Sequence, residues 1–289
     1  AERLAGCARR RLSGGPDRQH SAAPLRPARR DETERPAGIT RLRALLLSAG
    51  LGTRLRPITD TLPKALVPIC GRPLMEYWLR LLTEAGVDSI LVNTHYLADQ
   101  VVAYVKGSAF SRRVMIVHEG TLLGTAGTLL RNREFFADGP VMLIHGDNLS
   151  LFDVSAFTAA YERRPPGVEI TMMTFSSQTP ESCGIVELDE RGVVHAFHEK
   201  AANPPGNLAN AAVYILSPGI FDFLKTLGKE TIDFSTEVLP NYIGRINTYR
   251  NDVYHRDIGT PESLLAARYE YPAAAAGLSR LGETGGSPA

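Results

Sequence analysis

The most informative segment of the sequence is "LLLSAGLGTRLRPITDTLPKALVPICGRPL", residues 45–74. It begins with an apolar run typical of a buried strand and then becomes rich in glycine. Within eleven residues it places Arg54, Arg56 and Lys64. Glycine directly after a strand lets backbone N–H groups approach a phosphate closely. The stretch therefore predicts an anion site at the carboxyl edge of an α/β sheet, where such folds bind ligands.

Strand-like and helix-like segments alternate after this stretch. We expect strands at residues 43–50, 88–94, 113–120 and 139–148, and helices at residues 73–86, 97–107 and 124–136. Unbroken apolar strands in this order predict a Rossmann-like α/β fold with a mostly parallel sheet and helices on both faces. After residue 154 the pattern predicts a small mixed β region, with strands at 167–176 and 210–217, a hairpin at 183–200, and helices at 219–228 and 261–271.

The two ends of the chain differ from the middle in composition. Residues 1–40 hold nine arginines and five acidic residues without a core-forming period, whereas the rest holds 23 basic and 26 acidic residues. Such a segment buries too little apolar surface to offset its ordering entropy. We therefore predict a disordered extension at 1–40, one folded domain at 41–271 and a disordered tail at 272–289. The acidic balance of the domain argues against a nucleic-acid binder.

Composition excludes several other classes. No apolar run reaches 18 residues, so neither a transmembrane helix nor a membrane partner is expected. The three cysteines are too far apart for a disulfide framework or a metal pair, which favours a cytoplasmic protein. His195 and His198 lie on a predicted strand and point to opposite faces, which is a poor arrangement for a shared metal. The sequence leaves open whether the chain forms a homo-oligomer.

The glycine-rich loop fits none of the commonest phosphate-binding templates. "GLGTRL" lacks the third glycine of a dinucleotide fingerprint, and no G-K-[ST] follows as in a P-loop. It does match, in order and at length, the pattern G-x-G-T-R-(L/M)-x-P-(L/I)-T followed by P-K. The stretch thus closely resembles the signature of the sugar-1-phosphate nucleotidyltransferases, also called nucleotide-sugar pyrophosphorylases. "LGTAG" at 123–127, "HGDN" at 145–148, "HEK" at 198–200, "NAAVYIL" from Asn210 and "HRDIGTPESL" from His255 follow in the family's order, so the resemblance covers about residues 43–270.

The resemblance implies a reaction in which an NTP and a sugar 1-phosphate give an NDP-sugar and pyrophosphate. An oxygen of the sugar phosphate attacks the α-phosphorus in line, without a covalent enzyme intermediate, so catalysis rests on positioning and charge neutralisation. By motif, Arg54 would contact the β- and γ-phosphates and Lys64 the α-phosphate. The remaining nucleotide contacts implied are Ala49, Gly50, Gly52, Thr53, Glu119, Gly124 and Thr125.

The resemblance also implies a metal site and a sugar-phosphate site. Asp147, at the end of a predicted strand, and Asp257 in "RDIG" would hold Mg²⁺, which prefers one or two carboxylates plus phosphate oxygens; a turn-capping role is the alternative for each. The sugar-phosphate contacts implied are Gly184, Glu199, Lys200 and Asn210. One departure is that the family's E-K-P reads E-K-A here, with Ala201 in place of proline.

The choice of substrates rests on Glu119. A carboxylate only accepts hydrogen bonds, and guanine alone offers two adjacent donors on its pairing edge, which match two carboxylate oxygens. "LGTAG" with this preceding acid resembles mannose-1-phosphate guanylyltransferases, so GTP and mannose 1-phosphate are favoured. An exposed Glu119 with no role in binding is the alternative.

Other readings stay open at this point. They are a heptose 1-phosphate guanylyltransferase, a uridylyl- or thymidylyltransferase acting on another sugar 1-phosphate, and a regulatory subunit that binds nucleotide sugars without making them. The presence of Arg54, Lys64, Asp147 and Asp257 favours an enzyme over the regulatory subunit.

Overall fold

The computed structural model describes residues 42–87, 89–137 and 139–284, without the side chains of residues 277–284. The extension predicted at 1–40 lies outside the described residues. The strands are β1 Arg43–Leu47, β2 Pro68–Ile69, β3 Arg72–Pro73, β4 Ile90–Thr94, β5 Val114–His118, β6 Val141–His145, β7 Asn148–Leu151, β8 Ile170–Ser176, β9 Gly184–Leu188, β10 Val194–Glu199, β11 Leu208–Leu216, β12 Ile246–Arg250 and β13 Tyr254–Asp257. The α-helices are α1 Leu74–Glu84, α2 Ala98–Gly107, α3 Gly124–Arg131, α4 Val154–Glu162, α5 Ile220–Thr226 and α6 Pro261–Thr284.

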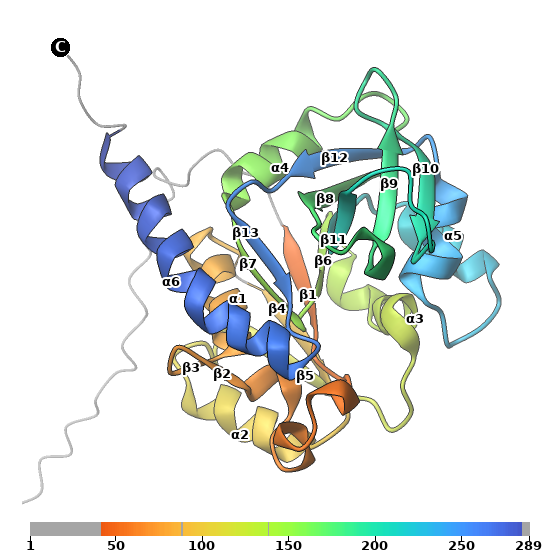
Figure 1. The fold of residues 1–289 in the computed structure, drawn as a ribbon. Helices are drawn as coiled ribbons and strands as arrows, with labels where there is room; N and C mark the ends of the chain where they lie inside the picture. The colour runs from red at the N-terminus through yellow and green to blue at the C-terminus, as the bar shows by residue number, and fades with distance from the viewer. Residues whose placement is uncertain (1–41, 88, 138, 285–289) are drawn as a thin grey trace, which may run out of the picture. The chain divides into compact units, whose positions relative to one another are not determined.

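Four parallel strands, in the order β6-β1-β4-β5, form one side of a nine-stranded sheet (Figure 1). β1 pairs in parallel with β4 and β6, and β4 pairs in parallel with β5. Helices α1, α2 and α3 connect these strands along the chain. All five residues of β4 are buried, as expected for a strand covered on both faces. The α/β class and the parallel core predicted from the sequence are therefore confirmed.

Two hydrophobic cores cover the two faces of the sheet. Side chains alternate along a strand, so Ala44 and Leu46 of β1 join one core and Leu45 joins the other. Helices α1, α2 and α4 pack on the first face, where Trp78 is almost fully buried. Helices α3 and α5 pack on the second face, with Leu129 completely buried. With both faces covered, a ligand has access to the sheet at the ends of its strands.

The remainder of the large sheet is mixed. β11 runs antiparallel to β6, β8 and β9, β9 and β10 form the predicted hairpin, and β12 pairs in parallel with β8. The register between β8 and β11 shifts between Asn210 and Tyr214, and Ala212 inside this shift has a φ of 54°. This half corresponds to the small mixed β region predicted after residue 154.

A short strand pair brings the end of the chain back to the centre of the sheet. β13 runs antiparallel to β7, which sets Asp257 opposite Asn148, next to Asp147. Helix α6 lies along this pair (Figure 1), and the guanidinium of Arg256 donates to both carboxylate oxygens of Glu270 at 2.8 and 2.6 Å. These contacts fix the segment that carries Asp257.

Helix α6 is longer than the sequence pattern predicts. The tail from Pro272 was expected to be disordered, whereas the helix continues to Thr284. A proline inside a helix removes the N–H that would bond to the carbonyl four residues earlier. Here that carbonyl belongs to Arg268, and it accepts a hydrogen bond from the Cys70 thiol at 3.4 Å. Alanine-rich sequence after Pro272 has high helix propensity, which accounts for the continuation. No helix in the described ranges is both long enough and apolar enough to cross a membrane.

Helix α3 begins against the backbone of residues 230–232. The N–H groups of Ala126 and Gly127 both donate to the carbonyl of Ile232, at 2.9 and 3.2 Å. A Cβ on Gly127 would collide with the carbonyl oxygen of Glu230, and a Cβ on Gly124 would lie 2.5 Å from the carbonyl oxygen of Ile232. The two glycines of "GTAG" therefore allow one backbone to pack directly on another.

This packing predicts the effect of a single methyl group. We expect Gly127→Ala to lower the free energy of unfolding by about 1–3 kcal/mol, because rigid backbone cannot yield to the new Cβ. Gly107→Ala is the matched control. Gly107 also belongs to a helix, as the last residue of α2, but no atom from another part of the structure lies within 4 Å of the position that a Cβ would take. It should leave stability unchanged or slightly higher. Urea denaturation of the two variants measures the difference in the free energy of unfolding. Equal urea midpoints would show that the backbone at residue 230 leaves room for a Cβ on residue 127.

Candidate nucleotide and metal site

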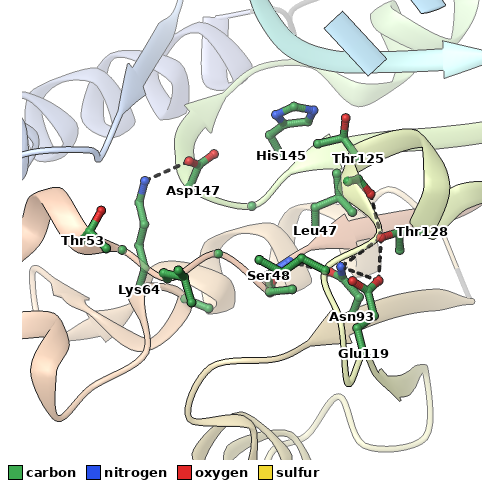
Figure 2. Close-up of a pocket in the computed structure, with 18 of the residues that line it drawn as sticks. Leu47, Ser48, Thr53, Lys64, Asn93, Glu119, Thr125, Thr128, His145 and Asp147 are labelled. Carbon is green, nitrogen blue, oxygen red and sulfur yellow. Dashed lines mark hydrogen bonds and ion pairs between the residues drawn. The ribbon is translucent and has the colours of Figure 1, made fainter. Parts of the chain in front are cut away.

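A cavity of about 450 Å³ opens at the carboxyl ends of β1, β4 and β6. Figure 2 shows Lys64 and Asp147 at one end, Asn93, Glu119 and Thr128 at the other, and Leu47 and Ser48 between them. Ten of the residues nominated from the sequence line it: Ala49, Gly50, Gly52, Thr53, Arg54, Lys64, Glu119, Gly124, Thr125 and Asp147. The cavity thus has one charged end and one end dominated by hydrogen-bonding groups.

The glycine-rich loop is a fixed turn. Gly52 has a φ of 64°, a left-handed conformation that favours glycine, and a Cβ there would lie 2.9 Å from Cγ2 of Thr59. The carbonyl of Gly52 accepts from the Thr59 hydroxyl at 2.7 Å and from the Leu55 N–H at 2.9 Å. These contacts direct Thr53 and Arg54 into the short helical turn Thr53–Leu55 at the rim of the cavity.

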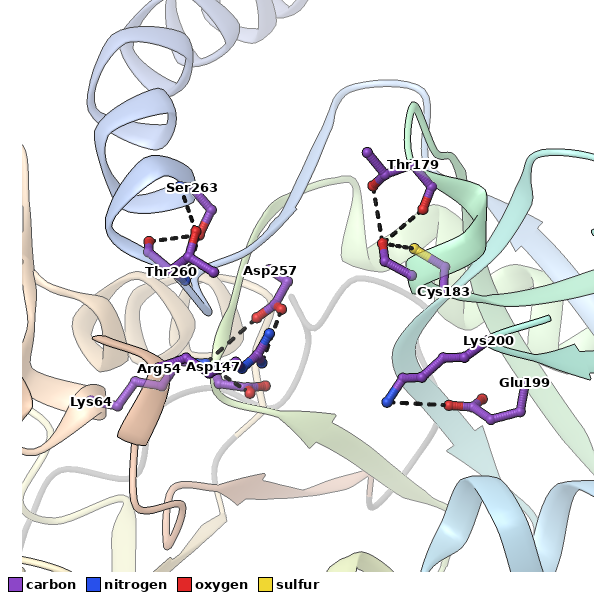
Figure 3. A network of polar contacts seen from close by, with 11 residues as sticks. Arg54, Lys64, Asp147, Thr179, Cys183, Glu199, Lys200, Asp257, Thr260 and Ser263 are labelled. Atoms are coloured by element: carbon purple, nitrogen blue, oxygen red, sulfur yellow. Dashed lines mark hydrogen bonds and ion pairs between the residues drawn. The ribbon is translucent and has the colours of Figure 1, made fainter. Parts of the chain in front are cut away.

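Lys64 is the centre of the charged end. Its ammonium lies 2.9 Å from Oδ2 of Asp147 and 3.5 Å from Oδ1 of Asp257. Arg54 reaches Oδ2 of Asp257 at 3.4 Å (Figure 3). The side chain of Lys64 is only 9% exposed, whereas that of Arg54 is 64% exposed. Lys64 is therefore held in place, while Arg54 is free to move toward a ligand.

The charges at this end stabilise one another. Burial by itself would raise the pKa of the Asp147 carboxyl, but the Lys64 ammonium outweighs it and the pKa is lowered from its ordinary value. Burial disfavours the charged form of His145 and lowers its pKa, so its ring is neutral near pH 7. A neutral imidazole adds no positive charge to the cavity, which leaves Lys64 and Arg54 as its cations.

The pair of aspartates fits a magnesium site that a bound phosphate completes. No group of three or more His, Cys, Asp or Glu side chains among the described residues could hold a metal ion. Mg²⁺ commonly takes one or two carboxylates, with phosphate oxygens and waters as its other ligands. Asp147 and Asp257 both reach the ammonium of Lys64, so their oxygens already face a single point.

Gly124 and Thr125 line the cavity and also pack against the segment that leads to Phe234. A Cβ on Gly124 has no room beside the backbone of Ile232. The Thr125 hydroxyl accepts from the N–H of Phe234 at 2.7 Å. The N–H groups of Ala126 and Gly127, which follow in α3, are bonded to Ile232 and are therefore not available to a phosphate.

Glu119 is buried, so the alternative of an exposed side chain is wrong. Only 6% of the residue is exposed. Its Oε1 accepts from the Thr128 hydroxyl at 2.6 Å and from Nδ2 of Asn93 at 3.0 Å. Its Oε2 has only a long contact of 3.4 Å from the N–H of Leu123. A match of guanine to both carboxylate oxygens is therefore not available, and Oε2 is the atom with capacity left.

The residues nominated for the sugar phosphate lie on β9, β10 and β11, except Lys200, which directly follows β10, and they do not line the cavity. Lys200 and Glu199 form an ion pair of 3.8 Å, and Figure 3 shows both side chains turned toward the side where Asp147 and Asp257 lie. Lys200 has a φ of 47°, an uncommon value for a residue with a side chain. Its N–H donates to the carbonyl of Cys183 at 3.0 Å, which holds this conformation.

Gly184 and Asn210 have clear structural duties. A Cβ on Gly184 would lie 2.6 Å from the ring of Phe197 and 2.8 Å from Oε2 of Glu199, so the glycine makes room for its neighbours on β10. Asn210 donates to the Tyr214 hydroxyl at 2.7 Å and accepts from the Ala212 N–H at 2.9 Å, which spans the irregular part of β11. Neither observation tests a contact with a sugar.

Several lining residues were not nominated from the sequence. They are Leu47, Ser48, Leu51, Ala65, Asn93, Leu122, Thr128, His145, Gly146 and Gly259. Asn93 ends the apolar run of β4, and His145 ends that of β6. A polar residue at the carboxyl end of a parallel strand is a recognisable signal for a site, and it was available in "ILVNT" and "VMLIH".

Comparison with known proteins places these features in a family. A model of the nucleotidyl transferase family matches residues 43–274. The chain is 33% identical over 218 residues to the UTP–glucose-1-phosphate uridylyltransferase of Synechocystis sp., a match that covers 70% of this chain and 55% of that protein. It is 30% identical over 227 residues to the mannose-1-phosphate guanylyltransferase of Mycobacterium tuberculosis, which covers 77% of this chain and 62% of that protein. The chain therefore spans between 55% and 62% of the length of these curated relatives.

A solved structure is also similar to this chain in fold and sequence. The crystal structure of HddC from Yersinia pseudotuberculosis complexed with GMP-PN aligns with a TM-score of 0.66 at 25% sequence identity. The alignment covers 79% of this chain and 99% of that chain.

The shared ammonium predicts how the two aspartates respond to a metal ion. Lys64→Met removes the charge that both carboxylates face, so we expect Mg²⁺ to raise the melting temperature of this variant more than that of the wild type. The effect should be absent in the double variant Lys64→Met/Asp147→Asn, which keeps one carboxylate. Thermal unfolding with and without Mg²⁺ measures it. An equal response of the wild type and Lys64→Met would show that the carboxylates do not form a cation site.

Proposed function

This chain belongs to the nucleotidyl transferase family, and from that premise we propose that it transfers a nucleoside monophosphate from an NTP to a sugar 1-phosphate. The products are an NDP-sugar and pyrophosphate. The observation that carries the proposal is the cluster of Arg54, Lys64, Asp147 and Asp257 at the carboxyl edge of the sheet, beside a cavity with a separate hydrogen-bonding end.

The proposed reaction is a single in-line displacement. An oxygen of the sugar phosphate forms a bond to the α-phosphorus of the NTP, and the bond from that phosphorus to the bridging oxygen of pyrophosphate breaks. Both reactants are anions, so the main task of the protein is to place them and to offset their charge. Lys64 is buried and fixed, which suits a contact to the α-phosphate that exists throughout the reaction. Arg54 is exposed and held by a long ion pair of 3.4 Å, which suits the β- and γ-phosphates and the departing pyrophosphate.

Mg²⁺ bound by Asp147, Asp257 and phosphate oxygens would supply further charge neutralisation. In the protein alone the ammonium of Lys64 occupies the space between the two carboxylates. Mg²⁺ at these carboxylates would replace Lys64 as their counter-charge, and the ammonium of Lys64 would then be available to the α-phosphate.

The sugar phosphate is proposed to bind at Lys200 and Glu199. Their side chains extend from the end of the β9–β10 hairpin toward the aspartates, and their mutual ion pair is long enough, at 3.8 Å, to be exchanged for contacts to a ligand. Lys200 would neutralise the phosphate, and Glu199 would accept hydrogen bonds from sugar hydroxyls. Mannose 1-phosphate is the proposed sugar, supported by the similarity to the mycobacterial mannose-1-phosphate guanylyltransferase.

GTP is the proposed nucleotide. Oε2 of Glu119 has capacity for one donor of guanine, N1–H or the 2-amino group, because its contact from the N–H of Leu123 is long at 3.4 Å and a carboxylate oxygen can accept two hydrogen bonds. Uracil and thymine would place carbonyl oxygens beside the same carboxylate, which repels them. Leu51 and Leu122 line the cavity with exposed apolar side chains that suit the faces of a planar base. HddC, which is 25% identical to this chain, was crystallised with GMP-PN, which is consistent with a guanine nucleotide.

A regulatory subunit that binds nucleotide sugars without making them is the second candidate. Such a protein has no need for phosphate-binding cations and metal-binding aspartates together in one cluster. The presence of both in the described residues favours the enzyme.

The roles of the two lysines predict different kinetic effects. Lys200→Ala should raise KM for the sugar 1-phosphate about tenfold or more with a smaller effect on kcat, whereas Lys64→Ala should mainly lower kcat. Lys225→Ala on α5 is the control, because this exposed lysine pairs only with Asp222 and lies outside the cavity. Pyrophosphate release with four NTPs and several sugar 1-phosphates measures all three. An absence of release in every combination would contradict the proposed reaction.

The role of Glu119 predicts the base preference. We expect kcat/KM to be highest for GTP, and Glu119→Gln to reduce the preference for GTP over UTP by roughly 5- to 150-fold, because an amide offers guanine a mismatched donor. Glu134→Gln, on the surface beyond α3, is the matched control. A wild type that prefers a pyrimidine nucleotide, or an unchanged preference in Glu119→Gln, would rule out Glu119 as the reader of the base.

A further inference from the structure

The carboxylate of Glu119 belongs to a buried network that has one member in common with the glycine-rich loop. Asn93, at 3% exposure, donates from Nδ2 to Oε1 of Glu119 at 3.0 Å. The same side chain accepts at Oδ1 from the N–H of Ser48 at 2.8 Å. Ser48 is the first residue after β1 and stands at the start of the loop that leads to Arg54. One asparagine thus joins the hydrogen-bonding end of the cavity to the start of the glycine-rich loop.

The network leaves Glu119 with a single orientation. Thr128, also buried, donates to Oε1 at 2.6 Å, so that Oε1 has two donors. The Glu119 N–H donates to the carbonyl of Thr94 at 2.8 Å, and its carbonyl oxygen lies 2.7 Å from Nδ1 of His95. With its backbone and Oε1 both fixed, the carboxylate cannot rotate without breaking buried hydrogen bonds. A buried polar atom left without a partner is costly, so the arrangement is strongly favoured.

The two polar atoms of the Asn93 amide make different contacts. The amide oxygen accepts from the N–H of Ser48 in the loop, and the amide nitrogen donates to Glu119. No other amino acid of similar size offers an acceptor and a donor at these two points. Aspartate keeps the acceptor for Ser48 but presents a second acceptor to Oε1 of Glu119, which repels it.

We propose that Asn93 is a positioning residue for nucleotide recognition, which holds Oε2 of Glu119 toward the base and ties that orientation to the start of the glycine-rich loop. This inference rests on the proposed function in that it takes the cavity to bind an NTP with its base at Glu119. It assigns Asn93 no contact with the ligand. Thr128 also donates to Glu119 but does not contact Ser48, so mutation can separate the orientation of Glu119 from the attachment of the loop.

The experiment measures binding of GTP and UTP to the full chain by calorimetry, and then pyrophosphate release. Asn93→Asp and Thr128→Val each remove one donor to Glu119 and keep the Ser48 contact. We expect each to reduce the ratio of the UTP and GTP dissociation constants by about tenfold or more. Asn93→Ala removes both contacts and should lower kcat in addition, because the loop that carries Arg54 loses its attachment at Ser48.

Asn247→Ala is the matched control. Asn247 is also buried, accepts from the Thr171 hydroxyl at 2.7 Å and donates to the carbonyl of Ala160 at 3.2 Å, but it lies on β12 outside the cavity. This variant should have a lower melting temperature and the same ratio of dissociation constants as the wild type. A purely structural role for Asn93 would give its variants the same behaviour as Asn247→Ala.

The outcomes separate this inference from the proposed reaction. Unchanged base selectivity in both Asn93→Asp and Thr128→Val, with reduced selectivity in Glu119→Gln, would overturn the role of Asn93 alone. Selective binding of GTP without pyrophosphate release would overturn the proposed reaction and leave the binding test of Asn93 valid. A wild type that binds no NTP would overturn both. A wild type that binds GTP and UTP equally would overturn the role of Asn93 and the choice of GTP, but not the proposed reaction. Thr128→Val keeps the test decisive if the Asn93 variants do not fold.

Discussion

A single buried ammonium holds three distant parts of this chain together. Lys64 follows the glycine-rich loop, Asp147 follows β6, and Asp257 ends β13, yet the Lys64 nitrogen is within 3.5 Å of both carboxylates. A lysine that is 8% exposed is tolerated only where opposite charge compensates for lost hydration. Much of the surrounding architecture serves this contact. Parallel pairing sets β1 beside β6, and the β7–β13 pair with its Arg256–Glu270 attachment to α6 delivers the second aspartate.

The parts of the structure that the sequence predicted correctly are those with a local signal. The buried strands β1, β4 and β6 each appear as an apolar run, and their alternation with helices specifies a parallel core. Asp147 could be placed at the edge of the sheet because Gly146 and Asp147 directly follow such a run. The ordered motifs around Arg54 and Lys64 then supplied what periodicity alone does not, namely that these cations converge.

The parts that the sequence did not predict depend on contacts between distant segments. Nothing near Glu119 shows that Asn93 and Thr128 occupy one of its oxygens, because this follows from the pairing of β4 with β5 and the position of α3. Gly124 was assigned to nucleotide binding, but only the structure shows the backbone of Ile232 at its Cα. Helix α6 beyond Pro272 was missed for the same reason, since a freed carbonyl finds its partner in Cys70 on a remote turn.

The strand pair β7–β13 also has a consequence for how the protein is made. Arg54 and Asp257 are 203 residues apart, so at a synthesis rate of about 5–20 residues per second the ribosome needs roughly 10–40 s to supply the second aspartate after the first cation. During that interval the parallel strands can already assemble around Lys64, which has only Asp147 as a counter-charge. The carboxylate pair is thus completed only after all four parallel strands have been made. Premature termination between Asp147 and Asp257 would leave a fragment with the glycine-rich loop and Lys64 but only one carboxylate of the pair.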